Sequence, residues 1–162
     1  MTRAEPNAWT IRRATEADSK RISDFQRSLN RPQRSESIAS EYFVAEVDGD
    51  IIGCAAVRAR EGTGYLYGLV VSKQWRRHGV GHGLTDCRLD WLRKNKAVKA
   101  YVLVMFWNIR FFKRHGFELA DRKLKPNLAV LHQDFADRWS SHSVLLMIDL
   151  KQISRSLSLL TV

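Results

Sequence analysis

The feature that most constrains this chain is a set of three glycines at alternate positions. They lie where an apolar pattern typical of a strand ends and one typical of a helix begins. The glycines are Gly79, Gly81 and Gly83. Before them, Tyr65–Val71 has the continuous apolar content of a buried strand. After them, apolar residues recur at three- and four-residue steps from Val80 to Trp91, which predicts an amphipathic helix. Because glycine inside a helix costs about 1 kcal/mol relative to alanine, we expect another group to approach this backbone closely.

The same segment predicts a phosphate site. A helix N-terminus presents unpaired backbone N–H groups and a partial positive charge, so it binds phosphate well. Arg76 and Arg77 add positive charge before the glycines, and arginine can bind phosphate through two parallel hydrogen bonds. The glycine spacing is that of neither a P-loop nor a Rossmann site. The alternative is a tight glycine-rich turn on a basic surface.

The remaining patterns predict an α/β domain with a mixed central sheet of six to seven strands flanked by helices. Strand patterns lie at 9–12, 42–47, 51–57, 65–71, 100–105, 117–120 and 144–150, and helix patterns follow residues 15, 80 and 108. A strand–helix–strand order in the second half implies parallel pairing there. Residues 31–41 are expected to form a loop or a weak helix, and 128–135 a helix. We expect a flexible arm at 1–8, one domain at 9–150 and a C-terminal tail at 151–162.

The apolar run at 51–57 is continuous, which predicts a strand buried on both faces. Turn signals lie at 48–50 and 60–64, and Gly68 marks a bulge or a close backbone approach. Thr15 and Asp18 have the spacing of a capping box, and Asn108 is the candidate cap of a short helix that Gly116 closes.

Composition sets further limits. The 162 residues carry a net charge of +10, which favours anionic partners. The two cysteines, Cys54 and Cys87, make no disulfide framework, and no histidine pair has a metal-ligand spacing, so no metal is expected. No apolar run approaches the roughly 20 residues that span a bilayer, and a signal peptide is lacking. We therefore expect a cytoplasmic protein with no membrane contact.

Two segments resemble the signatures of one family. The sequence Arg-Arg-His-Gly-Val-Gly at Arg76–Gly81 resembles the Arg/Gln-x-x-Gly-x-Gly/Ala signature of GNAT acetyltransferases, and Phe111–Phe117 resembles their second signature, aromatic-aromatic-x-x-x-Gly-Phe. The order of elements from Ile11 to Leu150 is also similar. The resemblance implies a GNAT-like fold splayed between its fourth and fifth strands. It also implies an N-acetyltransferase in which a primary amine directly attacks the thioester of acetyl-CoA, by positioning and charge stabilisation.

The resemblance assigns cofactor contacts residue by residue. Backbone groups of the fourth strand would bind the pantetheine arm and help polarise the thioester carbonyl, and the glycine turn would hold the diphosphate of coenzyme A. The residues expected to bind the cofactor are Leu69, Val70, Val71, Arg76, Arg77, His78, Gly79, Val80, Gly81, Asn108 and Phe112.

The sequence departs from the family where proton transfer is expected. The second aromatic of the second signature is often a tyrosine that protonates the leaving thiolate, but Phe112 has no proton to give. A glutamate on the fourth strand often serves as the base, and the matching position is Tyr65. Tyr65, Tyr67 and Tyr101 are the nearest candidates, although a tyrosine pKa near 10 makes a poor base at neutral pH. More remote candidates are Glu41, Glu46 and His132.

The acceptor is expected to be a small-molecule amine. The stretch Phe43–Ala56 resembles amino-acid N-acetyltransferases, including N-acetylglutamate synthase-like proteins, and Arg138 lies where that branch has an arginine suited to a substrate carboxylate. Alternatives are acetylation of a protein N-terminus or lysine, and an acyl-CoA-binding module with little catalysis. We do not expect a nucleic-acid partner, because the tryptophans do not interleave with a known basic motif. The sequence leaves open whether the protein forms a homodimer.

Overall fold

The computed structural model describes residues 8–31, 41–124 and 141–151. The chain divides into two compact units, each built from two stretches of sequence. The first unit comprises residues 1–56 and 68–88, and the second comprises 57–67 and 89–162. Several predicted features lie outside the described residues: most of the arm, of the expected loop at 31–41 and of the tail, together with the expected helix at 128–135, His132 and Arg138. None of the helices in the described ranges is long and apolar enough to cross a membrane.

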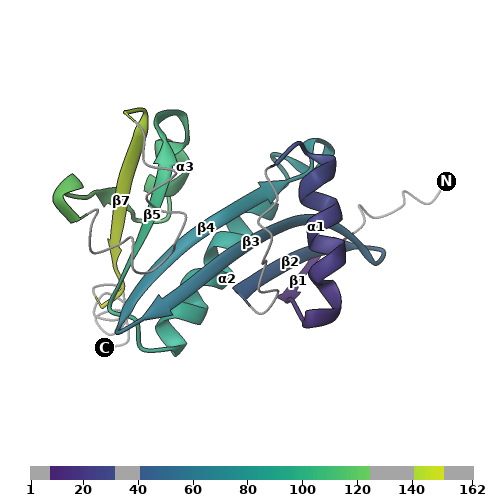
Figure 1. Cartoon of the computed structure of the whole chain (residues 1–162), viewed down its shortest axis with the longest axis horizontal. Coiled ribbons are helices and arrows are strands. Elements are labelled where there is room, and N and C mark those ends of the chain that lie inside the picture. The colour runs from purple at the N-terminus through teal and green to yellow at the C-terminus, as the bar shows by residue number, and fades with distance from the viewer. Residues whose placement is uncertain (1–7, 32–40, 125–140, 152–162) are drawn as a thin grey trace, which may run out of the picture. The chain divides into compact units, whose positions relative to one another are not determined.

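The described residues form a seven-stranded mixed sheet with helices between its strands, as the sequence predicted (Figure 1). The strands are β1 (Thr10–Arg13), β2 (Tyr42–Val47), β3 (Asp50–Arg60), β4 (Thr63–Val71), β5 (Lys99–Met105), β6 (Glu118–Leu119) and β7 (Ser143–Asp149). The α-helices are α1 (Ser19–Ser28), α2 (Val80–Lys94) and α3 (Ile109–Lys113), and the 3-10 turns are η1 (Glu16–Asp18), η3 (Lys73–Trp75), η4 (Phe106–Asn108) and η5 (Arg122–Leu124). The strand order is β1-β2-β3-β4-β5-β7-β6.

The turns between β2, β3 and β4 explain where the strand boundaries fall. Asp48 and Gly49 both have positive φ angles, 48° and 83°, as a two-residue hairpin turn of the favoured primed type requires. The next turn was expected over residues 60–64, but only Glu61 and Gly62 make it, with φ angles of 51° and 76°. Because two residues suffice, β3 extends to Arg60 and β4 begins at Thr63.

In the first unit, α1 and the start of α2 cover opposite faces of the sheet. Val80 and Leu84 of α2 pack against Ala55 of β3. On the other side, the Nε2 atom of Gln26 in α1 lies 4.0 Å from the Sγ atom of Cys54. Neighbouring residues of a strand point to opposite faces, so β3 is covered on both sides, as its continuous apolar run predicted.

An ion-pair network joins four elements of the first unit, β1, η1, α1 and β2. Arg12 of β1 donates to both carboxylate oxygens of the buried Asp18, at 2.7 and 2.9 Å, and to both oxygens of Glu46 in β2, at 3.0 and 2.9 Å. Arg21 of α1 donates to Asp18 at 2.9 Å and to Glu46 at 3.1 Å. Asp18 also accepts from the backbone N–H of Thr15 at 2.9 Å, the capping bond that the sequence predicted.

The second unit is built on β5 and β7. These strands pair antiparallel from Lys99 and Asp149 to Met105 and Ser143, and β6 pairs with the outer side of β7. The first part of β4 belongs to this unit and pairs parallel with β5, as expected. That ladder runs from Thr63 and Lys99 only as far as Leu66 and Val102, although both strands continue. The early end of the ladder is what the expected splay between the fourth and fifth strands requires.

Candidate functional site

The glycine turn lies in the first unit and leads directly into α2. The N–H of Gly83 donates to the carbonyl of Gly79 at 2.9 Å, and α2 begins at Val80. The N–H groups of Val80 and Gly81 therefore precede the first intrahelical hydrogen bond, and they are donors that a helix leaves for other partners. Gly79 has a φ angle of 82° and Arg77 one of 62°, so this turn uses the left-handed region twice.

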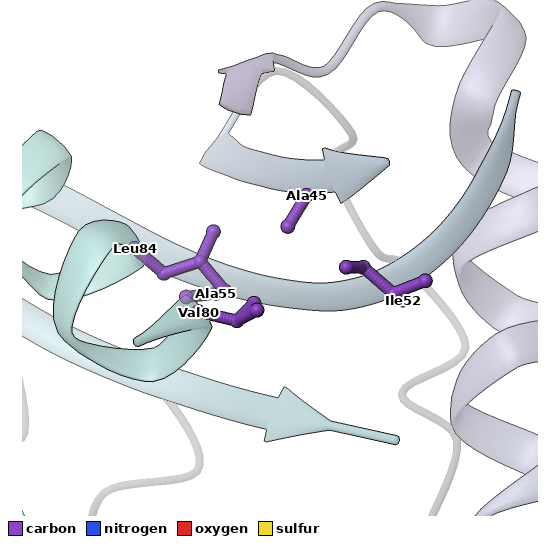
Figure 2. Packing of buried hydrophobic residues seen from close by; sticks show 5 residues of the cluster. All are labelled: Ala45, Ile52, Ala55, Val80 and Leu84. Atoms are coloured by element: carbon purple, nitrogen blue, oxygen red, sulfur yellow. The ribbon is translucent and has the colours of Figure 1, made fainter. Parts of the chain in front are cut away.

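The start of α2 is held by the hydrophobic core of the first unit. Figure 2 shows Val80 and Leu84 on the first turns of the helix, in one cluster with Ala45, Ile52 and Ala55 of the sheet. Val80 is 1% exposed and Leu84 is fully buried. This close packing depends on Gly53 of β3, because a Cβ at that position would lie 3.1 Å from the Val80 side chain and 3.2 Å from the Leu84 side chain. The helix N-terminus is thus fixed on a rigid support.

The glycines of this turn are present for different reasons. Gly79 is required by its positive φ angle, which most side chains disfavour. Gly83 is required by the protein itself, because a Cβ there would lie 2.9 Å from Ile11 and 3.0 Å from the ring of Trp9. The expected close approach to the backbone is therefore made at Gly83 by side chains of the first unit, and not by a ligand. Gly81 follows Val80 in the first turn of α2.

The basic side chains of the turn lie at the surface. Arg76, Arg77, His78 and Gly79 are exposed. The Nε atom of Arg76 donates to the carbonyl of Val71 at 3.2 Å, and the Nδ1 atom of His78 lies 2.8 Å from the carbonyl oxygen of Arg76. The His78 ring also meets the edge of Trp75, with 5.5 Å between ring centroids. These contacts order the turn around the α2 N-terminus.

The end of β4 leads into this turn. Leu69 and Val71 pack against the same core as α2, and Val70 is 8% exposed. The N–H of Ser72 donates to the carbonyl of Ile52 at 2.9 Å, which ties the strand end to β3. Gly68 has a φ angle of 65°, so the middle of this strand departs from regular extended backbone at a residue type that tolerates it.

The two candidate tyrosines lie together in the second unit. Tyr65 and Tyr67 share one face of β4 and stack with 5.6 Å between ring centroids and 12° between ring planes. Both are buried, at 2% and 7% exposure. Tyr65 pairs with Tyr101 of β5, and Tyr67 follows Leu66, the last β4 residue of the parallel ladder.

The expected cofactor residues of the second signature have unlike surroundings. Asn108 is exposed and stands at the N-cap position of α3, but its side chain makes no capping hydrogen bond, contrary to the cap expected there. Phe112 is 5% exposed and its ring meets the edge of Phe117, with centroids 5.6 Å apart. Gly116 closes α3 with a φ angle of 95°, as predicted. Phe112 is therefore a core residue of this unit.

The remote carboxylate Glu46 is occupied elsewhere. Hydrogen bonds from Arg12, and further bonds from Arg21, hold the pKa of Glu46 below its usual value. The same Arg12 holds the pKa of Asp18 well below its usual range. A carboxylate stabilised in its charged form by two arginines is a poor proton acceptor. Glu46 thus belongs to the structural network of the first unit.

Sequence reasoning missed Tyr42, although a signal for it existed. Its hydroxyl oxygen lies 3.4 Å from the position that a Cβ on Gly68 would occupy. A glycine in the middle of a strand often marks a close approach, and Gly68 was noted for that reason. The sequence could not reveal which side chain approaches, because Tyr42 and Gly68 lie on different strands.

The model of the acetyltransferase (GNAT) family matches residues 7–117 of this chain. The chain belongs to the GNAT acetyltransferase family. The family uses acetyl-CoA, and similar proteins were crystallised with coenzyme A. A search of the curated proteins finds no match.

Several solved structures are similar to this GNAT chain. N-acetylglutamate synthase from Neisseria gonorrhoeae, complexed with coenzyme A and N-acetyl-glutamate, is 25% identical with a TM-score of 0.75 over 91% of this chain. Rv2747 from Mycobacterium tuberculosis in complex with CoA is 19% identical, with a TM-score of 0.71 over 86% of this chain and 98% of its own. The Escherichia coli ribosomal-protein-S18-alanine N-acetyltransferase is 15% identical, with a TM-score of 0.68 over 88% and 94%. The latter two show the fold alone.

The chain spans only about a third of the synthase, 36% and 32% of its length in two structures. Within the GNAT fold, the turn of the first unit fits the diphosphate of coenzyme A by its chemistry. The Val80 and Gly81 amides, the α2 N-terminus and the exposed Arg76 and Arg77 together offer hydrogen-bond donors and positive charge.

Proposed function

We propose that this GNAT acetyltransferase transfers the acetyl group of acetyl-CoA directly to the primary amine of a small molecule, with an amino acid as the first candidate. The observation that carries the proposal is the glycine turn. Its amides precede the first hydrogen bond of a helix whose start is anchored by Val80 and Leu84, so donors for a diphosphate are preorganised. Preorganised donors lose little entropy on binding.

The residues would divide the work between binding and proton transfer. Arg76, Arg77 and the amides through Gly81 would hold the diphosphate, and backbone groups of residues 69–71 would hold the pantetheine arm. Acetyl-CoA supplies the acetyl group as a thioester. The stacked Tyr65 and Tyr67 are our candidates for accepting the amine proton. Because the usual Glu and Tyr are absent, we expect a slowed reaction, since a positioned acid or base contributes about 10²–10⁴-fold in rate.

An amino acid is the first candidate for two reasons. The stretch Phe43–Ala56 resembles amino-acid N-acetyltransferases, and the 25%-identical synthase was crystallised with N-acetyl-glutamate. Under this proposal Arg138, outside the described residues, would receive the substrate carboxylate. Transfer to a protein N-terminus or lysine, and acyl-CoA binding with little turnover, are the competing functions.

The binding half of the proposal is tested by thermal unfolding with and without acetyl-CoA. Ligand at 100 times its dissociation constant stabilises a protein by about 2.7 kcal/mol. Gly81→Asp should lose this ligand-induced stabilisation, because it places a carboxylate beside the expected diphosphate. The unliganded variant should stay folded, since an acid in the first turn of a helix is favourable.

Asn95→Asp is the matched control, because it adds the same charge just beyond the other end of α2, where Asn95 is exposed. This control should keep the ligand-induced shift. An undiminished shift in Gly81→Asp would show that the diphosphate binds elsewhere.

The acceptor half is tested by release of free coenzyme A thiol with a panel of amines. Turnover with one or more free amino acids, above that with peptides, supports the proposal. Turnover with peptides alone would replace it by protein acetylation. Binding of acetyl-CoA without thiol release from any amine would leave the acyl-CoA-binding function instead.

A further inference from the structure

Two small residues, Ala56 and Gly68, let one tyrosine of β2 reach β4. Tyr42 of β2 pairs with Ala56 of β3, and both lie against Gly68 of β4. From the position of a Cβ on Gly68, the Tyr42 hydroxyl oxygen would be 3.4 Å away, the Tyr42 ring 3.6 Å and the Ala56 Cβ 3.8 Å. The tyrosine ring thus extends across β3, over a small side chain, to Gly68.

The hydroxyl end of this tyrosine is held from α1. Gln26, itself 8% exposed, donates through Nε2 to the Tyr42 hydroxyl oxygen at 3.3 Å. Tyr42 is 3% exposed. A buried amide and a buried phenol are costly unless they are hydrogen-bonded to partners, so this pair fixes α1 and β2 to each other beside Gly68.

The backbone of Ala56, beneath the Tyr42 ring, is also held in place. The carbonyl oxygen of Ala56 accepts a hydrogen bond from the fully buried guanidinium of Arg88 at 3.2 Å. The Nε atom of Arg88 donates to the carbonyl of Leu84 at 3.2 Å, within α2. The strand beneath the Tyr42 ring is therefore tied to the helix that carries the glycine turn, and the ring rests on a rigid surface.

The backbone conformation at Gly68 decides where the next residues point. Gly68 has a φ angle of 65°, whereas residues of a regular strand have negative φ angles, so the chain changes direction at this glycine. The residues that follow are Leu69, Val70 and Val71, whose backbone groups the proposed function assigns to the pantetheine arm and the thioester carbonyl. A misplacement of about 1 Å at such a position can cost on the order of 100-fold in rate.

We propose that Tyr42, held by Gln26, is a positioning residue for acetyl transfer. Its hydroxyl end and ring fill the space beside Gly68 and keep this glycine in the one backbone conformation that aims the backbone of residues 69–71. This inference rests on the proposed function, because it needs acetyl transfer at this strand. It assigns Tyr42 no contact with the reacting atoms.

The test is a double-mutant cycle with Tyr42→Phe and Gln26→Leu. Each single variant should lower kcat by about tenfold or more while KM for acetyl-CoA changes less than about twofold, because the diphosphate turn is untouched. The double variant should be no slower than the slower single variant, since both remove one shared hydrogen bond.

Ile22→Val is the control for general loosening, because Ile22 is fully buried on the same helix and makes no such bond through its side chain. It should lower Tm while leaving kcat within about twofold. A Tyr42→Phe enzyme with wild-type kcat, an equal fall of kcat in Ile22→Val, or additive losses in the double variant would each overturn the positioning role. A wild-type chain that binds acetyl-CoA but acetylates no amine would instead contradict the proposed function itself.

Discussion

The two signature segments of this GNAT acetyltransferase, Arg76–Gly81 and Phe111–Phe117, are built in opposite ways. In the first, four consecutive residues from Arg76 to Gly79 are exposed. In the second, Phe112 and Phe117 are 5% and 1% exposed and meet edge to face. One segment presents backbone and charge to solvent, whereas the other fills the core of its own unit.

The difference indicates what each signature contributes in this chain. The first is held at its C-terminal end by Val80, and just beyond it by Leu84, which both pack against the core of the first unit. The second is its own support, because Phe112 also accepts the N–H of Phe117 at its carbonyl oxygen, at 3.3 Å. Substitutions in the first should therefore change ligand binding, and substitutions in the second should change stability.

The largest effect is expected from Phe117→Ala. Truncating a buried phenylalanine costs about 3–5 kcal/mol, because contacts are lost and a cavity is left. Urea unfolding followed by circular dichroism measures this loss. Arg77→Ala in the exposed signature is the matched control and should change stability by less than about 1 kcal/mol. A small loss of unfolding free energy in Phe117→Ala would break the comparison, since it would mean that the second signature does not contribute to the core of its unit.

An intermediate effect is expected from Gly83→Val. The added side chain would overlap the Trp9 ring, and overpacking of this kind costs about 1–3 kcal/mol. The cost should shrink in a Trp9→Ala background, where the contact with the ring is removed and the one with Ile11 remains, and chemical unfolding of the four proteins measures the coupling. Equal costs in both backgrounds would mean that Trp9 does not explain the glycine at this position.

The smallest effect is expected from the pH dependence of the Asp18 network. Hydrogen bonds from Arg12 lower the pKa values of Asp18 and Glu46 in the folded chain. A carboxylate with a lowered folded pKa stabilises the fold above its unfolded pKa and loses that contribution as the pH falls. The contribution, about 1–2 kcal/mol, should therefore be complete near pH 7 and decline below about pH 5.

Comparison of the wild type with Asp18→Asn separates this contribution from the repulsion between positive charges that destabilises the whole protein at low pH. The stability difference between the two proteins should narrow from pH 7 to pH 3, as urea unfolding at each pH would show. The network lies in the first unit only, so amide exchange should report the loss there ahead of the second unit. A difference that stays constant with pH would mean that Asp18 stabilises by packing.

Local patterns in the sequence predicted most of the fold. Continuous apolar runs gave β3 and β4, the Asp48-Gly49 pair gave the hairpin turn, and the change of period at Val80 gave the start of α2. The errors were local as well. The turn after β3 was expected to be longer, and Asn108 was expected to make a side-chain cap that is missing. Both depend on backbone geometry at single residues, which composition leaves open.

The sequence by itself determined the element order, the glycine turn before a helix and the two family signatures, because each is a short-range pattern of residue types. Only the tertiary structure decided why individual residues are present. Trp9 and Ile11 explain Gly83, Tyr42 explains Gly68, and Arg12 explains Asp18 and Glu46. Such explanations need contacts between segments far apart in the chain, and these contacts exist only once packing has brought the segments together.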